Sequence, residues 1–247
     1  MPQRSMPQPG AAKTLQRTPV PGPAFIRLLA RLADTGVDVR PSPLALSQRL
    51  SQWIDWNRAV ALSKALDGRL PDAVDDAPGC DRNEENECAR VRTALVNAIA
   101  EVSALVEKIP ADAAMDYPVF RERHLDLQRT MQAETGRLRG RLRDRLTQQS
   151  AQLARLAEVD AVMELTLSPR EQTLLATVPV LLGKHFDRLR EAAQTAAADL
   201  QSGDGEITLP PGSWLNLFRQ DLQSVLLAEL ELRFHPVEGL LAALRTR

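Results

Sequence analysis

This chain of 247 residues has few aromatic residues and few of the side chains that carry chemistry. Phe, Trp and Tyr together make up 4% of it, with three histidines, two cysteines and one tyrosine. Because 44% of the residues are nonetheless hydrophobic, the core must be built from Leu, Ala and Val, which is typical of helical bundles rather than β-sandwiches. The scarcity of nucleophiles and metal ligands favours a protein that works by contact.

The chain also lacks an excess of charge and a long apolar run. Its 31 basic residues nearly cancel its 32 acidic ones, giving a net charge of −1, whereas a dedicated nucleic-acid-binding protein is usually basic. No stretch approaches the roughly 18 uninterrupted apolar residues of a membrane-spanning helix, and the N-terminus has no apolar signal-peptide segment. We therefore expect a cytoplasmic protein without direct membrane insertion, linked to membrane proteins only through a partner.

Motifs of catalysis and of metal binding are missing as well. A carboxylate-bridged di-iron bundle needs paired Glu-x-x-His motifs, and no glutamate stands three residues before His124, His185 or His235. Cys80 and Cys88 match no zinc-binding spacing, and we expect reduced, solvent-facing thiols. Glycine motifs for nucleophile elbows, dinucleotides and phosphates are absent. The sequence thus predicts no catalytic, cofactor-binding or metal-binding residues and no cofactor.

Helical periodicity, interrupted by Pro- and Gly-containing breaks, makes up most of the chain. Gly36 and Gly68 suit the C-terminal caps of the first two helices. We expect repulsion among the acids after Gly68 to prevent packing there. The predicted parts are a disordered Pro/Gln-rich tail (1–22), an N-terminal helical pair (23–68), an acidic linker (69–87) and a helical bundle with a long central helix (88–247).

The central stretch, roughly residues 118–166, carries a narrow apolar seam flanked by charge. Its members recur at helical spacing and are Leu138, Leu142, Leu146, Leu153 and Leu156. Such a seam is typical of a coiled-coil-like helix or of an antiparallel helical hairpin. A turn near Gly136 or Gly140 would make a hairpin, and the sequence does not decide between the two forms.

Proline positions suggest the later helix boundaries. Ser168, Pro169 and Glu171 form a capping-box pattern, which predicts that a new helix begins there and runs to about residue 200. Pro179 predicts a kink within that helix. After a loop, a last long helix spans about 213–234, and Pro236 separates it from a short C-terminal helix.

The segment 137–145 contains five arginines and one acid. On a helix, Arg137, Arg141 and Arg145 would lie along one flank of the leucine seam, with the other two arginines along the opposite flank. The segment fits a grip on phosphates or on an acidic partner, but over nucleic-acid contact we favour a solvated face whose arginine stems cover the seam and whose charged ends pair with acids on a neighbouring helix.

Trp53 and Trp56 are three residues apart and would share one helix face. Tryptophan is enriched at the energetic centres of protein interfaces, so the pair fits a partner anchor. Such pairs more often pack in a core, which is the interpretation that we favour.

Three strings resemble the bacterial domain-of-unknown-function family numbered 3348. They are SQWIDWNRAVALSKALDG, preceded by PAFIRLLARLA; SPREQTLLATVPVLLGKHFDRLR; and LLAELELRFHPVEGLLAAL. The resemblance covers most of residues 17–245. It implies no activity and no catalytic residues to carry over. Members of that family look like cytoplasmic proteins often encoded beside membrane proteins of the motor-stator and peptidoglycan-binding types, which suits an accessory role.

We therefore predict an all-α, elongated helical bundle with a long coiled-coil-like helix or helical hairpin and a disordered N-terminal tail. The predicted function is that of a non-enzymatic scaffold or adaptor that binds a protein partner or itself. The predicted partner-binding residues are Arg137, Leu138, Arg141, Leu142, Arg145, Leu146, Trp53 and Trp56. The alternative is nucleic-acid binding through residues 137–145, and an enzyme would require carboxylates that converge in space.

Overall fold

The structure, a computed structural model, describes residues 24–33, 45–67, 82–107, 116–201 and 213–245. These residues form helices joined by short breaks, with no strand among them, so the all-α prediction is confirmed. The helices are α1 (Ala24–Leu32), α2 (Leu46–Trp53), α3 (Trp56–Asp67), α4 (Arg82–Glu107), α5 (Tyr117–Gln149), α6 (Ala151–Leu175), α7 (Val178–Gln201) and α8 (Ser213–Arg245). The predicted disordered tail, residues 1–22, lies outside the described residues.

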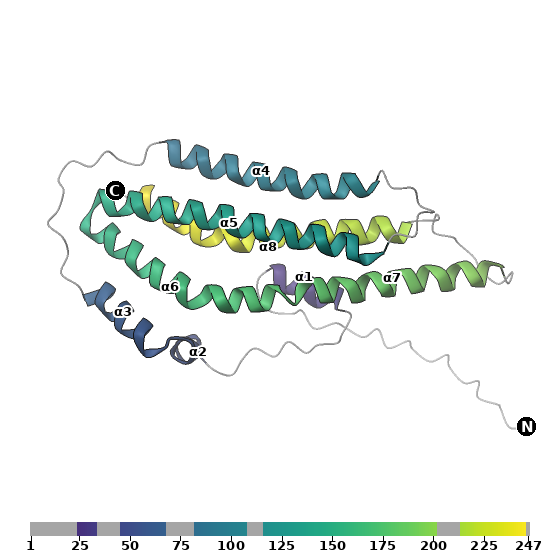
Figure 1. The fold of residues 1–247 in the computed structure, drawn as a ribbon, viewed down its shortest axis with the longest axis horizontal. Coiled ribbons are helices and arrows are strands. Elements are labelled where there is room, and N and C mark those ends of the chain that lie inside the picture. Colours follow the sequence, from purple (N-terminus) through teal and green to yellow (C-terminus); the bar gives the residue numbers. More distant parts are fainter. Residues whose placement is uncertain (1–23, 34–44, 68–81, 108–115, 202–212, 246–247) are drawn as a thin grey trace, which may run out of the picture.

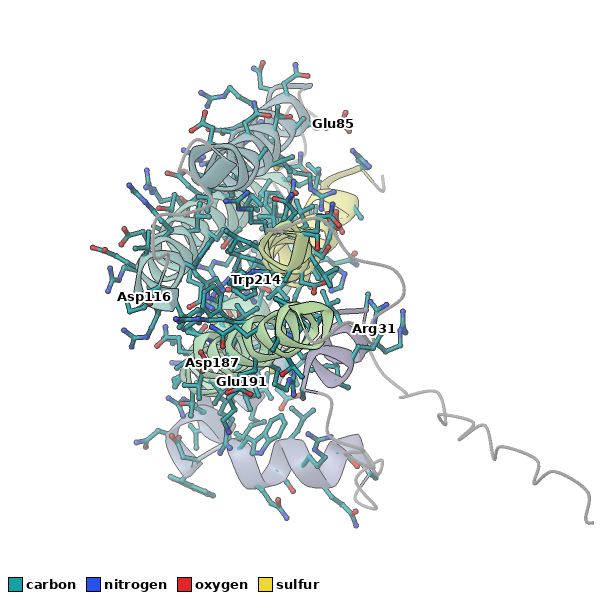
Figure 2. All side chains as sticks on the ribbon, turned by 90° about the vertical axis from the view of Figure 1, so that its right-hand side faces the viewer. Arg31, Glu85, Asp116, Asp187, Glu191 and Trp214 are labelled. Carbon is teal, nitrogen blue, oxygen red and sulfur yellow. The ribbon has the colours of Figure 1, made fainter. Side chains whose placement is uncertain are left out.

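The long helices lie side by side in an elongated bundle (Figure 1). Helix α8 packs against α5, α4 and α7, and α1 lies across α7 and α8. Seen along the long axis, α8 lies near the middle of the section, with α4, α5, α7 and α1 around it (Figure 2). The elongated shape follows from the length of these helices, which reach 33 residues in α5 and α8.

The central stretch is an antiparallel hairpin of α5 and α6 rather than one helix. The chain reverses at Ser150, whose backbone is extended (φ −159°, ψ 159°) and whose side chain accepts a hydrogen bond from the backbone N–H of Leu153 at 3.2 Å. Serine is a favoured N-cap because its oxygen satisfies one of the N–H groups left free at a helix start. Gly136 and Gly140 lie inside α5, so the turn is at neither of them.

The capping-box prediction at Ser168 is wrong. Pro169 lies inside α6, which ends at Leu175, and α7 begins at Val178. Ala157 and Leu175 are buried and five helical turns apart, so they share the face that packs on the bundle. Burial along that face outweighs the local stop signal. Pro179 then falls in the first turn of α7, where a missing N–H breaks no intrahelical bond, and not at a kink within a longer helix.

Pro236 likewise does not end a helix. Helix α8 continues through it to Arg245, with Phe234 and Val237 buried on either side of the proline. The prediction of a separate short C-terminal helix is therefore wrong. Packing of the apolar side chains that follow the proline compensates for the lost backbone hydrogen bond.

Within the described residues of the N-terminal part, 24–33 and 45–67, the structure has the three helices α1, α2 and α3. The predicted second helix is divided at Ile54 and Asp55 into α2 and α3, and Asp55 Oδ1 accepts a hydrogen bond from the backbone N–H of Arg58 at 2.8 Å at the start of α3. Helix α4 begins at Arg82, within the predicted acidic linker, whose earlier residues lie outside the described ones. The division into domains stays a prediction.

Among the described helices, none is long and apolar enough to cross a membrane. The largest fully buried side chains include Phe120, Phe186, Phe218, Phe234, Ile99 and Met131. Cys88 is also buried, 7% exposed, so the expectation of a solvent-facing thiol is wrong for it, and Cys80 lies outside the described residues.

Candidate functional site

The predicted partner-binding leucines lie in the interior of this chain. Leu138, Leu142 and Leu146 are 1%, 2% and 0% exposed. They lie on α5, which packs against α4, α6, α7 and α8 of the same chain. In this structure the part of the seam on α5 is therefore core, because the chain's own helices cover it, whereas Leu156 on α6 is 38% exposed.

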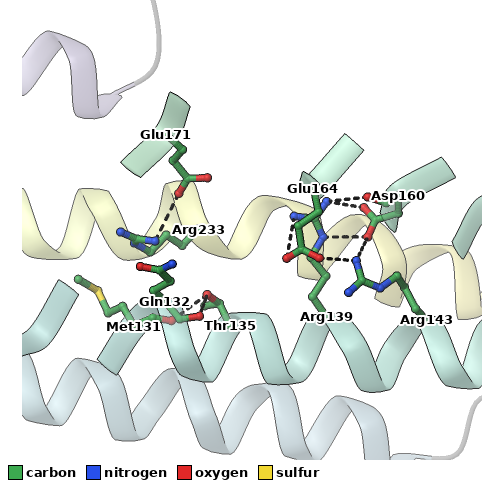
Figure 3. Close-up of polar contacts among 9 residues, drawn as sticks. All are labelled: Met131, Gln132, Thr135, Arg139, Arg143, Asp160, Glu164, Glu171 and Arg233. Carbon is green, nitrogen blue, oxygen red and sulfur yellow. Dashed lines mark hydrogen bonds and ion pairs between the residues drawn. The ribbon is translucent and has the colours of Figure 1, made fainter. Parts of the chain in front are cut away.

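The arginines of residues 137–145 face carboxylates of neighbouring helices. Arg139 binds the carboxylate of Asp160 on α6 through two hydrogen bonds, from Nε at 2.8 Å and from Nη2 at 2.7 Å. Arg143 Nη1 binds Glu164 Oε2 at 2.5 Å and Asp160 Oδ2 at 3.2 Å. Figure 3 shows these four side chains meeting between α5 and α6. Burial alone would lower the pKa of Arg139, but Asp160 and then Glu164 raise it, so this guanidinium stays charged.

The other flank of the arginine segment pairs mainly with α4. Arg141 lies 2.7 Å from Glu87, and Arg145 Nε lies 2.6 Å from Glu84 Oε1. Glu84 and Glu87 belong to the predicted acidic linker, in which repulsion was expected to prevent packing. They instead hold α4 against α5, because arginines of α5 face them. Arg137 pairs within α5, with Glu134 at 2.8 Å.

The two tryptophans do not share a helix face, because the break between α2 and α3 separates them. Trp53 is half-buried, with the guanidinium groups of Arg49 and Arg170 5.1 Å and 5.0 Å from its ring centroid. Trp56 is 81% exposed, so the core interpretation is wrong for it.

The interior contains a polar network that sequence reasoning missed. His124 of α5 and Glu229 of α8 are both 0% exposed, and His124 Nε2 lies 3.7 Å from Glu229 Oε2. Glu229 accepts hydrogen bonds from Gln128 Nε2 at 2.9 Å and from Arg233 Nε and Nη2 at 3.0 Å and 2.8 Å. Arg233 Nη1 also donates to Glu171 of α6 at 3.4 Å. We call these five residues the buried network.

The charges of the buried network stabilise one another. Burial by itself would raise the pKa of Glu229, but His124, the charge of Arg233 and the hydrogen bonds from Gln128 and Arg233 together lower it below its ordinary value. Glu229 is therefore an anion that accepts from a buried cation. Neither ring nitrogen of His124 has a partner within hydrogen-bond distance among the described residues, so its contact with Glu229 at 3.7 Å is electrostatic.

A cavity of about 190 Å³ opens beside the buried network, between α5, α6 and α8. Arg139, Glu164, Glu171 and Arg233 contribute two charges of each sign to its lining. Figure 3 shows Glu171 and Arg233 meeting near Gln132 and Thr135 of α5. A polar cavity of this size suits several ordered water molecules. His124 is not among its lining residues, so a molecule in this cavity would not contact the imidazole.

A second contact between a histidine and a carboxylate lies between α7 and α8. His185 Nε2 is 2.7 Å from Asp221 Oδ2, and His185 Nδ1 is 3.4 Å from Arg188 Nη2. Arg188 in turn donates to the backbone carbonyls of Leu32 and Ala33 at the end of α1. This chain of contacts therefore ends on another helix of the protein.

The sequence held a partial signal for the buried network. Gln128 follows His124 by four residues on the buried face of α5, and Arg233 follows Glu229 by four on the buried face of α8. Polar residues at this spacing within an apolar stripe indicate a buried pair, but only the fold shows that the two pairs meet. Among the described residues, no three of His, Cys, Asp and Glu are grouped so as to hold a metal ion.

Comparison with known proteins yields a family and no function. A family model described as a protein of unknown function (DUF3348) matches residues 11–246. No curated protein and no solved structure matches the chain.

Proposed function

This chain belongs to the DUF3348 family of proteins of unknown function, and we propose from its own residues that it is a non-enzymatic helical scaffold or adaptor that acts by protein–protein contact. The observation that carries the proposal is the contrast between its charged and its apolar groups. The arginine segment is bound to the chain's own carboxylates, whereas large apolar side chains reach the surface.

The three most exposed of the described large apolar side chains lie on α3 and α6. Trp56 of α3 is 81% exposed, and Leu165 and Leu174 of α6 are 65% and 70% exposed. Single exposed leucines are ordinary, but an exposed tryptophan is the side chain most enriched at interface hot spots. We therefore assign partner contact to Trp56 among the residues predicted for that role. Leu138, Leu142 and Leu146 would contribute only if the bundle opened.

Partners and location follow from the same proposal. The protein would work in the cytoplasm, as an accessory to a membrane-associated bacterial assembly, and contact the membrane only through the partner. Self-association is the simplest form of the proposal to measure.

Light scattering after size exclusion, together with affinity capture from native cells including membrane fractions, tests the proposal. We expect the full chain to form an oligomer or to retain a partner, and Trp56→Ala to lose that contact. Val119→Ala, at an exposed residue of α5, is the matched control and should keep it. A chain that stays monomeric and retains no partner that depends on Trp56 would contradict the proposal.

Nucleic-acid binding through residues 137–145 stays a separate prediction. All five arginines already lie near carboxylates, which reduces the positive charge available to phosphates. A mobility-shift titration at low salt, with the wild type and Arg137→Gln/Arg141→Gln, tests it. Binding that weakens in the double variant would support nucleic-acid binding through this segment, and no binding at low salt would contradict it.

A further inference from the structure

Helix α1 is a short segment packed on the outside of the bundle. It has nine residues and contacts α7 and α8. An isolated helix of this length is marginal in water, because nucleation is unfavourable and few hydrogen bonds follow it. The helical form of α1 therefore depends on the surface beneath it.

One face of α1 makes the apolar contacts. Phe25, Leu28 and Leu32 are 4%, 9% and 6% exposed and follow one another at intervals of three and four residues. The opposite side is exposed, and Arg31 points away from the bundle (Figure 2). This is how an amphipathic helix is recognised by a protein surface, with a few anchors on one stripe.

The end of α1 is held through its backbone. Arg188 of α7 donates from Nη1 to the carbonyl of Ala33 at 2.8 Å and from Nη2 to the carbonyl of Leu32. The last carbonyls of a helix have no intrahelical partner, and a cation beside them also interacts favourably with the helix dipole. Because Arg188 donates to backbone carbonyls and not to side chains, it can bind the C-terminal end of any helix that lies in this position.

On the surface beneath α1, Arg188 is itself held in place by polar contacts. His185 lies 3.4 Å from Arg188, and Asp221 lies 2.7 Å from His185. These residues belong to α7 and α8, which contact each other directly as well as through α1. We define the α1-docking surface as the faces of α7 and α8 under α1 together with Arg188, His185 and Asp221, and we expect these contacts between α7 and α8 to hold it in shape when α1 is undocked.

We propose that the α1-docking surface is a binding site for an amphipathic helix of a protein partner, and that α1 is its internal competitor. The partner helix would carry large apolar residues at positions i, i+3 and i+7 and would end beside Arg188. This inference rests on the proposed adaptor function and adds the chemistry of the ligand. Because α1 is tethered to its site, its effective concentration is high, and the apparent affinity for the partner falls in proportion to the fraction of time that the site is free of α1.

A peptide corresponding to residues 20–36, labelled with a fluorophore, is the probe for this site. The receptor is the full chain carrying Phe25→Asp and Leu28→Asp, which frees the surface from its own α1. Fluorescence anisotropy should show the peptide binding this variant at least about tenfold more tightly than the wild type, since the tethered competitor is removed. Absence of binding, or equal binding to both chains, would overturn the proposal.

Two matched changes test the recognition itself. Replacing Leu28 by Asp in the peptide should abolish binding, because it removes the central anchor. Arg188→Gln in the receptor should weaken binding by roughly tenfold, as expected for lost charge-assisted hydrogen bonds. Arg190→Gln, at an exposed arginine on the same helix, should leave binding unchanged, and an equal loss in both variants would contradict a specific role for Arg188.

Hydrogen exchange on the unaltered full chain decides the matter even if the double variant does not fold. We expect the amides of α1 to exchange at least about tenfold faster than those of α5 and α8, and still faster when unlabelled peptide competes. Equal protection of α1 and α8 would make α1 a permanent part of the core and overturn the proposal. A partner that depends on Trp56 would survive that outcome, so the two proposals fail separately.

Discussion

The environment of Tyr117 shows how one residue links three helices. Its ring, on α5, lies 5.8 Å from that of Phe186 on α7 and 6.3 Å from that of Phe218 on α8. Its hydroxyl donates to the backbone carbonyl of Pro179 in the first turn of α7. Burial raises the pKa of Tyr117 to about 12, although Arg121 and a backbone hydrogen bond at Gly183 act in the opposite direction. The folded state therefore favours the neutral, protonated form of Tyr117.

The first prediction uses the fact that this is the chain's single tyrosine. Absorbance of tyrosinate near 295 nm should stay low in the folded protein up to about pH 11 and should rise near pH 10 in denaturant. A folded pKa above the unfolded one means that the stabilisation is complete below the unfolded pKa and is lost as pH rises towards about 12. Titration near pH 10 in the folded state would show that the ring is not held as described.

The second prediction concerns Glu229, whose pKa is lowered in the folded state. Its stabilisation is complete above the unfolded value of about 4.5 and is lost as pH falls through the lower folded pKa. Glu229→Gln leaves the buried charge of Arg233 with only Glu171, whose carboxylate is 3.4 Å away and 39% exposed, so we expect a loss of about 3 kcal/mol in the free energy of unfolding at pH 7. The loss should shrink as pH falls below about 4.5, because the unfolded wild type then takes up a proton at Glu229 that the folded protein does not yet take up.

Urea unfolding at pH 7 and pH 3.5 measures both effects. Glu231→Gln is the matched control, because Glu231 lies on the same helix, is exposed and binds Arg92 at 3.3 Å. An exposed ion pair contributes at most about 1 kcal/mol. Equal losses at the two positions would mean that the buried network does not stabilise the fold.

At the scale of helices, the periodicity predicted which residues are helical but not where each helix ends. The reversal at Ser150 escaped prediction because the same leucine spacing continues on both sides and serine is common inside helices too. Pro169 and Pro236 were misread for the opposite reason, since each is a strong local stop signal. Whether a proline ends a helix depends on how much apolar surface the next turns bury, which only the tertiary fold determines.

The third prediction compares two glycines inside helices. A Cβ at Gly183 of α7 would lie 2.9 Å from Cε1 of Tyr117, whereas one at Gly140 of α5 would meet nothing within 4 Å. Gly140→Ala should therefore stabilise the protein by about 0.5–1 kcal/mol through helix propensity. Gly183→Ala should destabilise it by about 1–3 kcal/mol, because the packed tyrosine ring must move.

Thermal unfolding of the two alanine variants distinguishes these signs directly. Gly183→Ala should also shift the tyrosine titration towards the ordinary value, which a general loss of stability would not do while the protein remains folded. If both variants were stabilised, the ring of Tyr117 would have room to retreat, and the close approach of α5 and α7 would not depend on glycine.

At the scale of the whole molecule, composition predicted more than motifs did. The low aromatic content and the balance of 31 basic against 32 acidic residues fit a leucine-rich bundle whose helices are joined by ion pairs. Arg92 of α4 with Glu238 of α8 at 2.6 Å, and Arg143 of α5 with Glu164 of α6, are examples. The sequence could not show which arginine pairs with which acid, because each ion pair joins residues whose proximity depends on helix order and register.

The last prediction asks whether the leucine seam of α5 is core or interface. Leu142 is 2% exposed, whereas Leu156 of the same predicted seam is 38% exposed on α6. Leu142→Asp creates both a cavity and an unpaired buried charge, so we expect the free energy of unfolding to fall by more than about 4 kcal/mol, enough to unfold many domains. Leu156→Asp should cost less than about 1 kcal/mol, because water reaches that side chain. Circular dichroism with light scattering separates the cases: a folded Leu142→Asp monomer derived from an oligomeric wild type would mean that the seam opens to receive another chain.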